Sequence, residues 1–408
     1  MSESQHDPVV VAGAGPTGMT AALALRARGV PVVVLEAEPE GRNRPGSRAI
    51  YVHGTTLHTL ERNREGLGKR LADAGLVWPT RRTLFRGKEV FSRTYDSPGG
   101  TGDLPHFTSL PQVETEEFLL DALAELDVEI HWDSAVETVE SEPDGVRVET
   151  EDGREWETPY VVGADGAGST VRKEIGSNFE GSQSENSFII ADVDEHPDEP
   201  RAHERVFHYD HPEVGGRNVL LVPFTGGWRV DIQCKLTDDP ERLASDAVVS
   251  DMVAKTLGER YRDRVDWVSS YQFKQVTADS FVDEHRRVLL AGEAGHLFAP
   301  FGARGMNSGI ADADEAASAI AVAARSESDG VARAEVELYG ARREAAAEWN
   351  KNAAGEALEY LQGDGVVTKF KKRAAAGLSD YYEDAGEWLD DAPYGPRGGP
   401  PIATIGRY

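Results

Sequence analysis

The sequence predicts an α/β protein in which a helix-covered parallel sheet carries an inserted antiparallel sheet and ends in further helices. Three short apolar segments each run directly into a glycine-rich turn, which is typical of buried parallel strands. Residues 188–281 consist mostly of strand-like segments, interrupted by a helix at 245–260. Residues 310–324 and 331–362 have the composition of helices.

The composition excludes several classes of protein and site. The 408 residues carry 43 basic and 71 acidic side chains, a net charge of −28. Nucleic acids and anionic membrane surfaces repel such a chain, so we expect neither as a partner. The single cysteine, Cys234, permits no internal disulfide and no cysteine-based metal cage. The N-terminus is acidic and no apolar run reaches ~20 residues, so we expect a cytoplasmic protein.

The chain begins with a strand, a glycine turn, a helix and a second strand. Residues 9–12 are apolar and too few for a helix, and residues 18–28 are rich in Ala and Leu. Pro31 then opens a second apolar strand that ends at Glu36. This order predicts a βαβ unit of Rossmann-like type.

The turn in this unit carries Gly13, Gly15 and Gly18 at GxGxxG spacing. Such glycines allow the tight turn, the approach of a pyrophosphate to the backbone, and close packing of helix on strand. Glu36 lies 18 residues after Gly18, where a carboxylate accepts ribose hydroxyls. The motif therefore predicts a dinucleotide site, and Glu36 argues against a glycine turn that merely packs.

The middle of the chain alternates short strands with one helix. Residues 80–95 resemble a hairpin, and residues 113–126 form an amphipathic helix with acidic residues in its first turn. Three strand-like pieces follow, at 128–132, 146–150 and 156–165. The tail from Pro393 is too rich in Pro and Gly to pack as an element.

Two later strands also end in glycine turns. The first, VVGADGAGSTVR, places Asp165 and Gly166 directly after the strand, where the carboxylate can meet a ligand or a backbone N–H. Taken alone, it is explained as a strand-to-helix turn capped by Ser169 or Thr170. The second follows the strand at 287–291 and runs from Gly292 through GARGMN toward a helix, and it too can be a structural turn.

Together, the order and spacing of the three motifs resemble the class A flavoprotein monooxygenases, the family of para-hydroxybenzoate hydroxylase. The resemblance covers about residues 8–325. It implies FAD as the cofactor, NADPH or NADH as co-substrate, and O₂. The implied activity is hydroxylation of a small aromatic, phenolic or polyketide-like, substrate through a C4a-hydroperoxyflavin. One departure is Gly292-Glu293 where the family usually has Gly-Asp, and another is Arg304 in GARGMN in place of the commoner Gln.

The resemblance also implies a set of residues around FAD. These are Gly13, Gly15, Pro16, Thr17, Gly18, Glu36, Ala37, Arg48, Gln112, Asp165, Gly166, Glu293, Gly305, Met306 and Asn307. Backbone N–H groups at 305–307 are expected to stabilise negative charge on the flavin. We also expect the cluster Arg42, Arg44 and Arg48 to offset the charge of the cofactors.

The candidate catalytic residues rest on weaker signals. The resemblance implies that Pro300 shapes the cavity over the flavin ring. His53, His208 and Tyr271 are candidate bases or hydrogen-bond acceptors for a phenol, although each is at least as well explained as structural. The polar group formed by His203, His208, Asp210 and His211 fits no known metal spacing, so we expect no metal site.

The sequence leaves other activities on this scaffold open. They are epoxidation, Baeyer–Villiger oxygen insertion, isoprenoid-type reduction, and flavin binding without monooxygenase turnover. We expect a monomer or a homodimer. The expected domains are a discontinuous FAD-binding domain (1–79, 104–180 and 283–362), a substrate-binding β-sheet domain (80–103 and 181–282), and a C-terminal helix with a Pro/Gly-rich tail (363–408).

Overall fold

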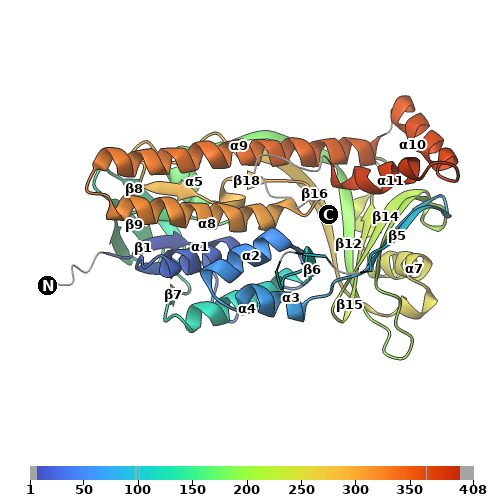
Figure 1. The fold of residues 1–408 in the computed structure, drawn as a ribbon, viewed down its shortest axis with the longest axis horizontal. Coiled ribbons are helices and arrows are strands. Elements are labelled where there is room, and N and C mark those ends of the chain that lie inside the picture. The colour runs from blue at the N-terminus through green and yellow to red at the C-terminus, as the bar shows by residue number, and fades with distance from the viewer. Residues whose placement is uncertain (1–6, 97–98, 101, 364, 396–408) are drawn as a thin grey trace.

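The computed structural model describes residues 7–96, 99–100, 102–363 and 365–395. Two sheets form the two ends of the molecule, a five-stranded parallel sheet beside helices α1 and α8 and an eight-stranded sheet beside helix α7 (Figure 1). The long helix α9 (Asp329–Gln362) runs along one side of both. No helix in the described part of the chain combines the length and the apolar composition that crossing a bilayer requires.

The parallel sheet brings distant segments of the sequence together. Its strand order is β17-β11-β1-β2-β7, and every neighbouring pair is parallel. The strands are β1 (Val9–Ala12), β2 (Val32–Leu35), β7 (Glu129–His131), β11 (Val161–Gly163) and β17 (Val288–Leu290). Because parallel strands end at the same edge, the three predicted glycine turns leave β1, β11 and β17 side by side.

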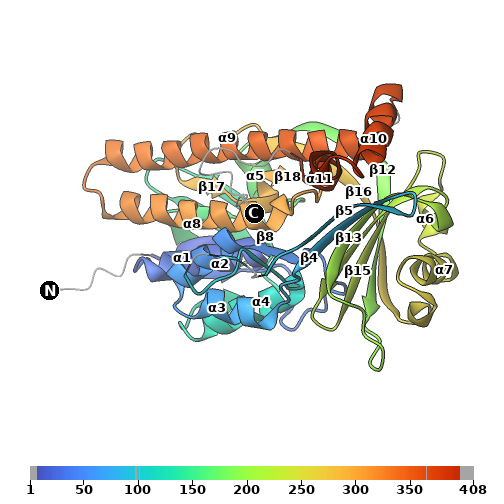
Figure 2. The same cartoon turned by 45° about the vertical axis from the view of Figure 1, so that its right-hand side comes forward.

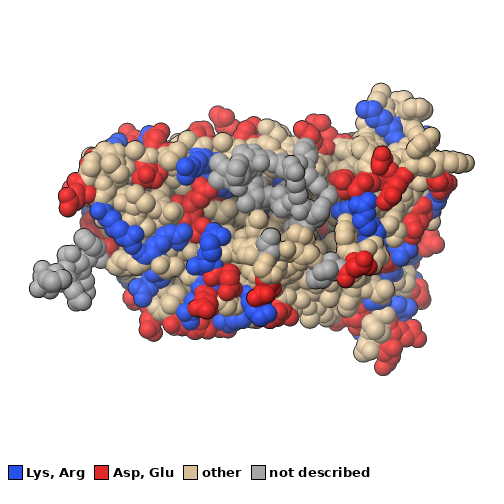
Figure 3. Space-filling model, viewed as in Figure 1, with Lys and Arg blue, Asp and Glu red and all other residues tan. Residues whose placement is uncertain are grey.

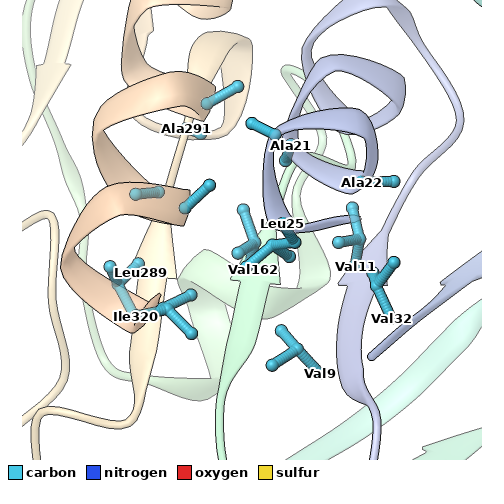
Figure 4. Packing of buried hydrophobic residues seen from close by; sticks show 14 of the residues in the cluster. Val9, Val11, Ala21, Ala22, Leu25, Val32, Val162, Leu289, Ala291 and Ile320 are labelled. Carbon is cyan, nitrogen blue, oxygen red and sulfur yellow. The ribbon is translucent and has the colours of Figure 1, made fainter. Parts of the chain in front are cut away.

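Helices rich in small residues cover this sheet. Helix α1 (Pro16–Ala27) packs against α8 (Arg304–Arg325) through alanines and Leu25, and Ile320 of α8 reaches the strands (Figure 4). The strands are apolar throughout because helices and neighbouring segments bury them on both faces. The α/β class predicted from the sequence is confirmed.

The eight-stranded sheet has the order β18-β16-β12-β15-β14-β13-β4-β5. Its strands are β4 (Thr80–Phe85), β5 (Lys88–Thr94), β12 (Phe179–Asp194), β13 (Glu204–His211), β14 (Arg217–Phe224), β15 (Gly227–Gln233), β16 (Val265–Ala278) and β18 (His296–Leu297). The sheet is antiparallel, as predicted, except that β4 pairs with β13 in parallel. The hairpin of β4 and β5 thus forms one edge of the sheet (Figure 2).

The two faces of this sheet have different functions, because successive side chains along a strand point to opposite faces. On one face, Ile189, Val230 and their neighbours pack against helix α7 (Asp246–Thr256), close to the predicted 245–260. On the other face, Ile190, Phe207 and their neighbours line a cavity. The sheet therefore supplies both a core and the wall of a site.

Smaller elements connect these layers. They are β3 (Tyr51–His53) paired with β6 (Phe107–Ser109), α2 (Gly54–Asn63), α3 (Leu67–Ala74), α4 (Gln112–Ala124), α5 (Thr170–Glu174), α6 (Pro240–Leu243), and the three-stranded sheet of β8 (Val136–Ser141), β9 (Val146–Thr150) and β10 (Glu155–Thr158). Helices α10 (Val366–Leu378) and α11 (Glu383–Asp391) follow α9.

Three predicted elements differ from the structure. Residues 156–165 are not one strand, because Pro159 separates β10 from β11 and the two join different sheets. Helix α8 begins at Arg304 rather than at residue 310, since its early glycines hide the helical pattern in the sequence. The tail packs as far as Tyr394, where Pro393 is buried in a short 3-10 helix (Ala392–Tyr394), and residues 396–408 lie outside the described residues.

Gly18 should tolerate no side chain. A Cβ there would lie 1.9 Å from the carbonyl oxygen of Gly13. We expect Gly18→Ala to lower the free energy of unfolding by about 1–3 kcal/mol, although alanine favours helix. Gly377→Ala in α10, where a Cβ meets nothing within 4 Å, is the control and should be neutral or stabilising. Equal unfolding curves for both variants in urea would contradict this packing.

Candidate functional site

The three glycine turns pack against one another. A Cβ on Gly13, whose φ is +98°, would lie 2.5 Å from the carbonyl oxygen of Ala164 in the second turn. A Cβ on Gly292 or on Gly309 would lie 2.5 Å or 2.3 Å from Thr17 Oγ1 in the first. The motifs that are distant in sequence therefore form one unit, held by contacts that only glycine allows.

A second set of glycines opens onto empty space. Gly15, Gly166, Gly168 and Gly305 line one cavity, and a Cβ on any of them would meet no atom within 4 Å. The cavity measures about 1100 Å³, which exceeds the ~300–1,000 Å³ usual for one small ligand. Backbone that is left bare along a cavity of this size fits a long phosphate-bearing ligand such as FAD.

Two helix N-termini reach this cavity. Helix α1 begins at Pro16 and α8 begins at Arg304, and no side chain caps either helix. Pro16 of α1 and Gly305 and Met306 of α8 line the cavity. Uncapped N–H groups and the helix dipole favour negative charge at both places. The N-terminus of α1 is therefore suited to a pyrophosphate, and the N-terminus of α8 is suited to a second negative charge.

Most of the predicted FAD residues line this cavity. Only Gly18 and Asn307 do not. Gly18 packs α1 against the strand turn, and the side chain of Asn307 holds neighbouring segments together. Its Oδ1 accepts the N–H of His53, and its Nδ2 donates to the carbonyl of Tyr51. Both residues support the cavity from behind.

Glu36 lies at the end of β2 and is 4% exposed. Its carboxylate accepts the N–H groups of Ala14 and Glu38 and pairs with Arg42 at 2.8 Å. Burial raises the pKa of the Glu36 carboxyl, but these donors outweigh burial and leave the pKa below its usual value. Glu36 is therefore an ionised acceptor at the cavity wall, as a ribose-binding residue requires.

The predicted arginine cluster is only partly available to a ligand. Arg42 pairs with Glu36, and Arg44 pairs with Glu38 and Glu116. The acids offset part of the charge of Arg42 and Arg44, and Arg44 lines the cavity nevertheless. That the three arginines offset the charge of the cofactors stays a prediction. Arg48 lines the cavity, in a left-handed backbone conformation with φ of 52°.

Asp165 has a structural role alongside its place in the cavity wall. It accepts the hydroxyl of Ser169 at 2.5 Å and the N–H of Val171 at 3.1 Å. Ser169 in turn caps α5 by accepting the N–H of Arg172. The capped-turn interpretation of this motif thus describes its geometry, and Asp165 and Gly166 both line the cavity.

Glu293 follows β17 in the short 3-10 helix Gly292–Ala294 and lines the cavity. Burial raises the pKa of the Glu293 carboxyl, and His296 and Arg48 lower it. Behind the turn, Asp312 of α8 accepts the N–H of Gly292 at 2.9 Å and contacts His296 Nε2 at 2.7 Å. Glu293, which is one methylene longer than the usual aspartate, therefore lies on a turn that Asp312 holds in place.

The candidate catalytic residues divide into two groups. His53, Tyr271 and Pro300 line the cavity, whereas His208 lies outside it and accepts the N–H of Gly87 in the β4–β5 turn. Burial, together with the charge of Arg304, lowers the pKa of His53 to about 4. His53 is thus a neutral imidazole at pH 7, and its Nε2 lies 3.2 Å from the carbonyl oxygen of Gly302.

Aromatic and apolar side chains line the part of the cavity next to the eight-stranded sheet. They include Trp78, Phe107, Ile190, Phe207, Leu220, Trp267, Phe273 and Phe301. Trp228, by contrast, is fully buried in the core on the other face. Apolar walls that exclude water suit a flat aromatic ligand.

The sequence reasoning missed the charged residues of this wall. Arg81, Arg205 and Arg229 line it, and Tyr394 from the C-terminal segment closes it. The one available signal was the alternation of Arg205 and Phe207 on a strand, which places both on one face. Among the described residues, no three His, Cys, Asp or Glu side chains form a group that could hold a metal ion.

The fold and the cavity at the carboxyl edge of the parallel sheet together define an α/β protein of the flavoprotein type. Residues 6–351 match the family model described as the FAD binding domain, and the chain belongs to the class A flavoprotein monooxygenase family. The predicted resemblance and the FAD cofactor are thereby confirmed.

Relatives of known activity agree with this assignment. The chain is 33% identical over 354 residues to 6-methylpretetramide 4-monooxygenase from Streptomyces rimosus, covering 84% of this chain and 60% of that protein. It is 30% identical over 331 residues to para-nitrophenol 4-monooxygenase from Pseudomonas sp. strain WBC-3, covering 77% of each. The crystal structure of p-nitrophenol 4-monooxygenase PnpA from Pseudomonas putida DLL-E4 superposes with a TM-score of 0.78 at 25% identity, covering 96% of this chain and 99% of that one. The chain spans 60% of the length of the first two curated relatives.

Gly15 should tolerate a side chain in the fold but not in the FAD complex. Its φ of −77° suits any residue, and a Cβ would point into open space. We expect purified Gly15→Val to fold with wild-type circular dichroism but to be colourless, because the side chain fills the approach of the pyrophosphate. Gly377→Val, remote from the cavity, should stay yellow. A Gly15→Val protein with normal flavin absorbance would refute the placement.

The Glu293 carboxylate should strengthen FAD binding but lower the stability of the FAD-free protein. Because its folded pKa is raised, its ionised form is penalised at neutral pH, and the penalty disappears below the unfolded value of about 4.3. We expect Glu293→Gln to raise the Tm of FAD-free protein by about 1 °C or more at pH 7, but not at pH 4.

The same variant should bind FAD about tenfold more weakly, as loss of a charged hydrogen-bond acceptor predicts. Fluorescence titration of FAD measures this affinity. Glu327→Gln, at an exposed position, is the control and should change neither quantity. Unchanged FAD affinity in Glu293→Gln would count against a role for this carboxylate.

Proposed function

We propose that this protein is an FAD- and NAD(P)H-dependent monooxygenase that uses O₂ to hydroxylate a small aromatic substrate. The observation that carries the proposal is one continuous cavity. It runs from the open glycine backbone at Gly15, past the N-terminus of α8, to the aromatic wall of the eight-stranded sheet. Cofactor and substrate can therefore occupy the same cavity.

The chemistry that FAD would supply when bound is uptake of hydride from NAD(P)H and activation of O₂. The chain holds and orients the reactants. The N–H groups at Gly305 and Met306 stabilise negative charge at the α8 end of the cavity. The apolar side chains of the sheet exclude water, and Pro300 with Phe301 shapes the space between them and α8.

We propose that FAD is held by the cavity-lining members of the predicted set. These are Gly13, Gly15, Pro16, Thr17, Glu36, Ala37, Arg48, Gln112, Asp165, Gly166, Glu293, Gly305 and Met306. His53 and Tyr271 are candidates to contact a phenol, and the neutral state of His53 lets it act as a hydrogen-bonding group. His208 is not part of the proposed site because it lies outside the cavity.

A phenolic or polyketide-like substrate, a cytoplasmic location and a monomeric or homodimeric state complete the proposal. Para-nitrophenol, which names the activity of one relative, is a phenol.

The expected division into an FAD-binding domain and a substrate domain is also part of the proposal. The pairing of β4 with β13 supports grouping residues 80–103 with residues 181–282. Acidic and basic residues are interspersed on the face seen in Figure 3, as on a solvated surface.

The test is NAD(P)H oxidation by purified holoprotein, with and without candidate phenols. We expect phenol-stimulated oxidation, with one atom of ¹⁸O₂ recovered in the product. NADPH and NADH are compared at equal concentration, and the Gly15→Val variant is the inactive control. A holoprotein whose flavin is reduced by neither nucleotide with any aromatic would exclude monooxygenase turnover and favour flavin binding without it.

A further inference from the structure

The end of the molecule formed by α10 and α11 exposes a cluster of large apolar side chains. Of the thirteen such side chains that are exposed in the described residues, seven lie between residues 366 and 388. They are Val366, Val367, Phe370, Leu378, Tyr381, Tyr382 and Trp388. Single exposed apolar residues are normal on a protein, but a cluster of them marks a surface that another molecule covers.

Helix α10 presents apolar side chains to solvent. Val366, Val367 and Phe370 recur at helical spacing and lie on one side of the helix, and Val366 and Phe370 are 84% and 70% exposed. The opposite side packs on the body of the protein, where Lys372 Nζ lies 4.6 Å from the ring centre of Tyr360. In Figures 1 and 2, α10 extends from the body beyond the end of α9. A helix that faced only water would present polar side chains instead.

Helix α11 is fixed to the edge of the eight-stranded sheet. Gly386 packs so closely on β5 that a Cβ there would lie 2.1 Å from the carbonyl oxygen of Val90. Asp390 is fully buried and lies 2.6 Å from Arg205 Nη1. Tyr381, in the turn before the helix, nevertheless remains 80% exposed. The outward side of this firmly attached segment is therefore accessible to a partner.

Charge is segregated along the same surface. Residues 366–378 contain four basic residues and no acidic residue, whereas residues 379–391 contain six acidic residues and no basic residue. Lys371 and Arg373 are both exposed. In the view of Figure 3, Lys and Arg lie over α10 and Asp and Glu lie over α11. A basic, apolar half thus lies next to an acidic, aromatic half.

A second copy of this chain fits this surface, because the two halves complement each other. A two-fold axis brings each half of an interface onto the other half of the partner copy, so every contact is made twice. Asp380 and Glu383 pair with Lys88 and Arg93 of β5, but their side chains are still 58% and 77% exposed. They can therefore meet cations of the partner copy as well.

An anionic membrane is a less suitable partner. Basic and apolar residues on one helix are typical of helices that lie on membrane surfaces. Here, however, the acids at 380–387 share the surface with α10, and the whole chain has a net charge of −28. Both repel anionic lipid. In a pair of identical chains, the same acids become attractive contacts.

We propose that the protein forms a two-fold symmetric homodimer in which α10 of each copy packs on residues 380–388 of the other. Phe370 lies in the apolar centre of this interface, and Lys371 and Arg373 face the acids at 383 and 384 of the partner copy. None of residues 366–388 lines the cavity, so the inference does not depend on the proposed reaction.

The first test is the mass of the purified holoprotein in solution, measured by sedimentation equilibrium over a range of concentrations. We expect twice the 44.3 kDa of one chain. Phe370→Glu should weaken dimerisation at least about tenfold, because the two-fold axis places the new charge in the interface twice. A wild-type protein that is monomeric at every concentration would overturn the proposal, as would a Phe370→Glu variant that dimerises like wild type.

Val331→Glu is the matched control. Val331 is also an exposed apolar residue on a helix, but it lies near the start of α9, at the opposite end of that helix from α10. We expect this variant to dimerise like wild type. Both substitutions are at exposed positions, so both variants should fold with wild-type circular dichroism. If Val331→Glu dissociated the dimer and Phe370→Glu did not, the interface would lie elsewhere and the proposal would be wrong.

A charge exchange tests which helices meet. The double variant Lys371→Glu, Arg373→Glu places acids against acids in its own dimer, and the double variant Glu383→Lys, Asp384→Lys places bases against bases. Each should be largely monomeric alone. Mixed in equal amounts they should form a heterodimer, because both of its contacts then join opposite charges. A mixture that stayed monomeric would contradict the packing of α10 on α11.

Vesicles of phosphatidylglycerol test the membrane alternative. We expect the holoprotein to remain dimeric and not to float with these vesicles. A monomeric holoprotein that floats with them, and no longer does so after Phe370→Glu, would identify a lipid-binding surface and refute the dimer. No turnover is measured in any of these experiments. A holoprotein that dimerises but oxidises no NAD(P)H with any aromatic would refute the proposed function and leave the dimer intact.

Discussion

The close packing of the three glycine turns at the carboxyl edge of the parallel sheet is the constraint on which the rest depends. Gly13 lies against Ala164, and Thr17 fits between Gly292 and Gly309. These contacts bring β1, β11 and β17 into one surface although about 150 and 125 residues separate them. With these contacts made, α1 and α8 begin at the same cavity, and the remaining bare glycines face that cavity.

Net charge and local charge have different consequences in this chain. A protein of net charge −28 binds a polyanionic cofactor, and the arginines that follow β2 do not simply neutralise it, because acids engage Arg42 and Arg44. The uncapped N-termini of α1 and α8 lie at the cavity, as do Arg44 and Arg48. Helix dipoles act over short distances. Salt at 0.1 M screens the charges of the acidic surface within about 10 Å, so these charges have little effect in the cavity. The net charge of the chain therefore does not describe the charge that a ligand meets in the cavity, which depends on nearby backbone groups and side chains.

Sequence patterns predicted the parts of the fold that depend on local rules. Glycine spacing, apolar strands and Glu36 predicted the βαβ unit and the turn that lines the cavity, since each has a direct physical meaning at one position. The start of α8 was missed because Gly305 and Gly309 are weak helix formers that tertiary packing overrides. The parallel pairing of β4 with β13 joins strands about 120 residues apart, and no local pattern encodes a pairing of that kind. Arg81 and Arg205 become neighbours only through that pairing.

The two halves of the cavity differ in how much of each a local sequence pattern can predict. The cofactor half is formed by backbone and by glycines, where substitution changes the turns themselves, so its motif is visible in sequence. The substrate half is formed by side chains on alternate positions of a stable sheet, with α11 and Tyr394 placed across it. Each of these side chains can change without altering the strand that carries it, because the opposite face retains its packing on α7. On such a scaffold, side chains of the cavity wall can be exchanged without disturbing the glycine turns at the other end of the cavity.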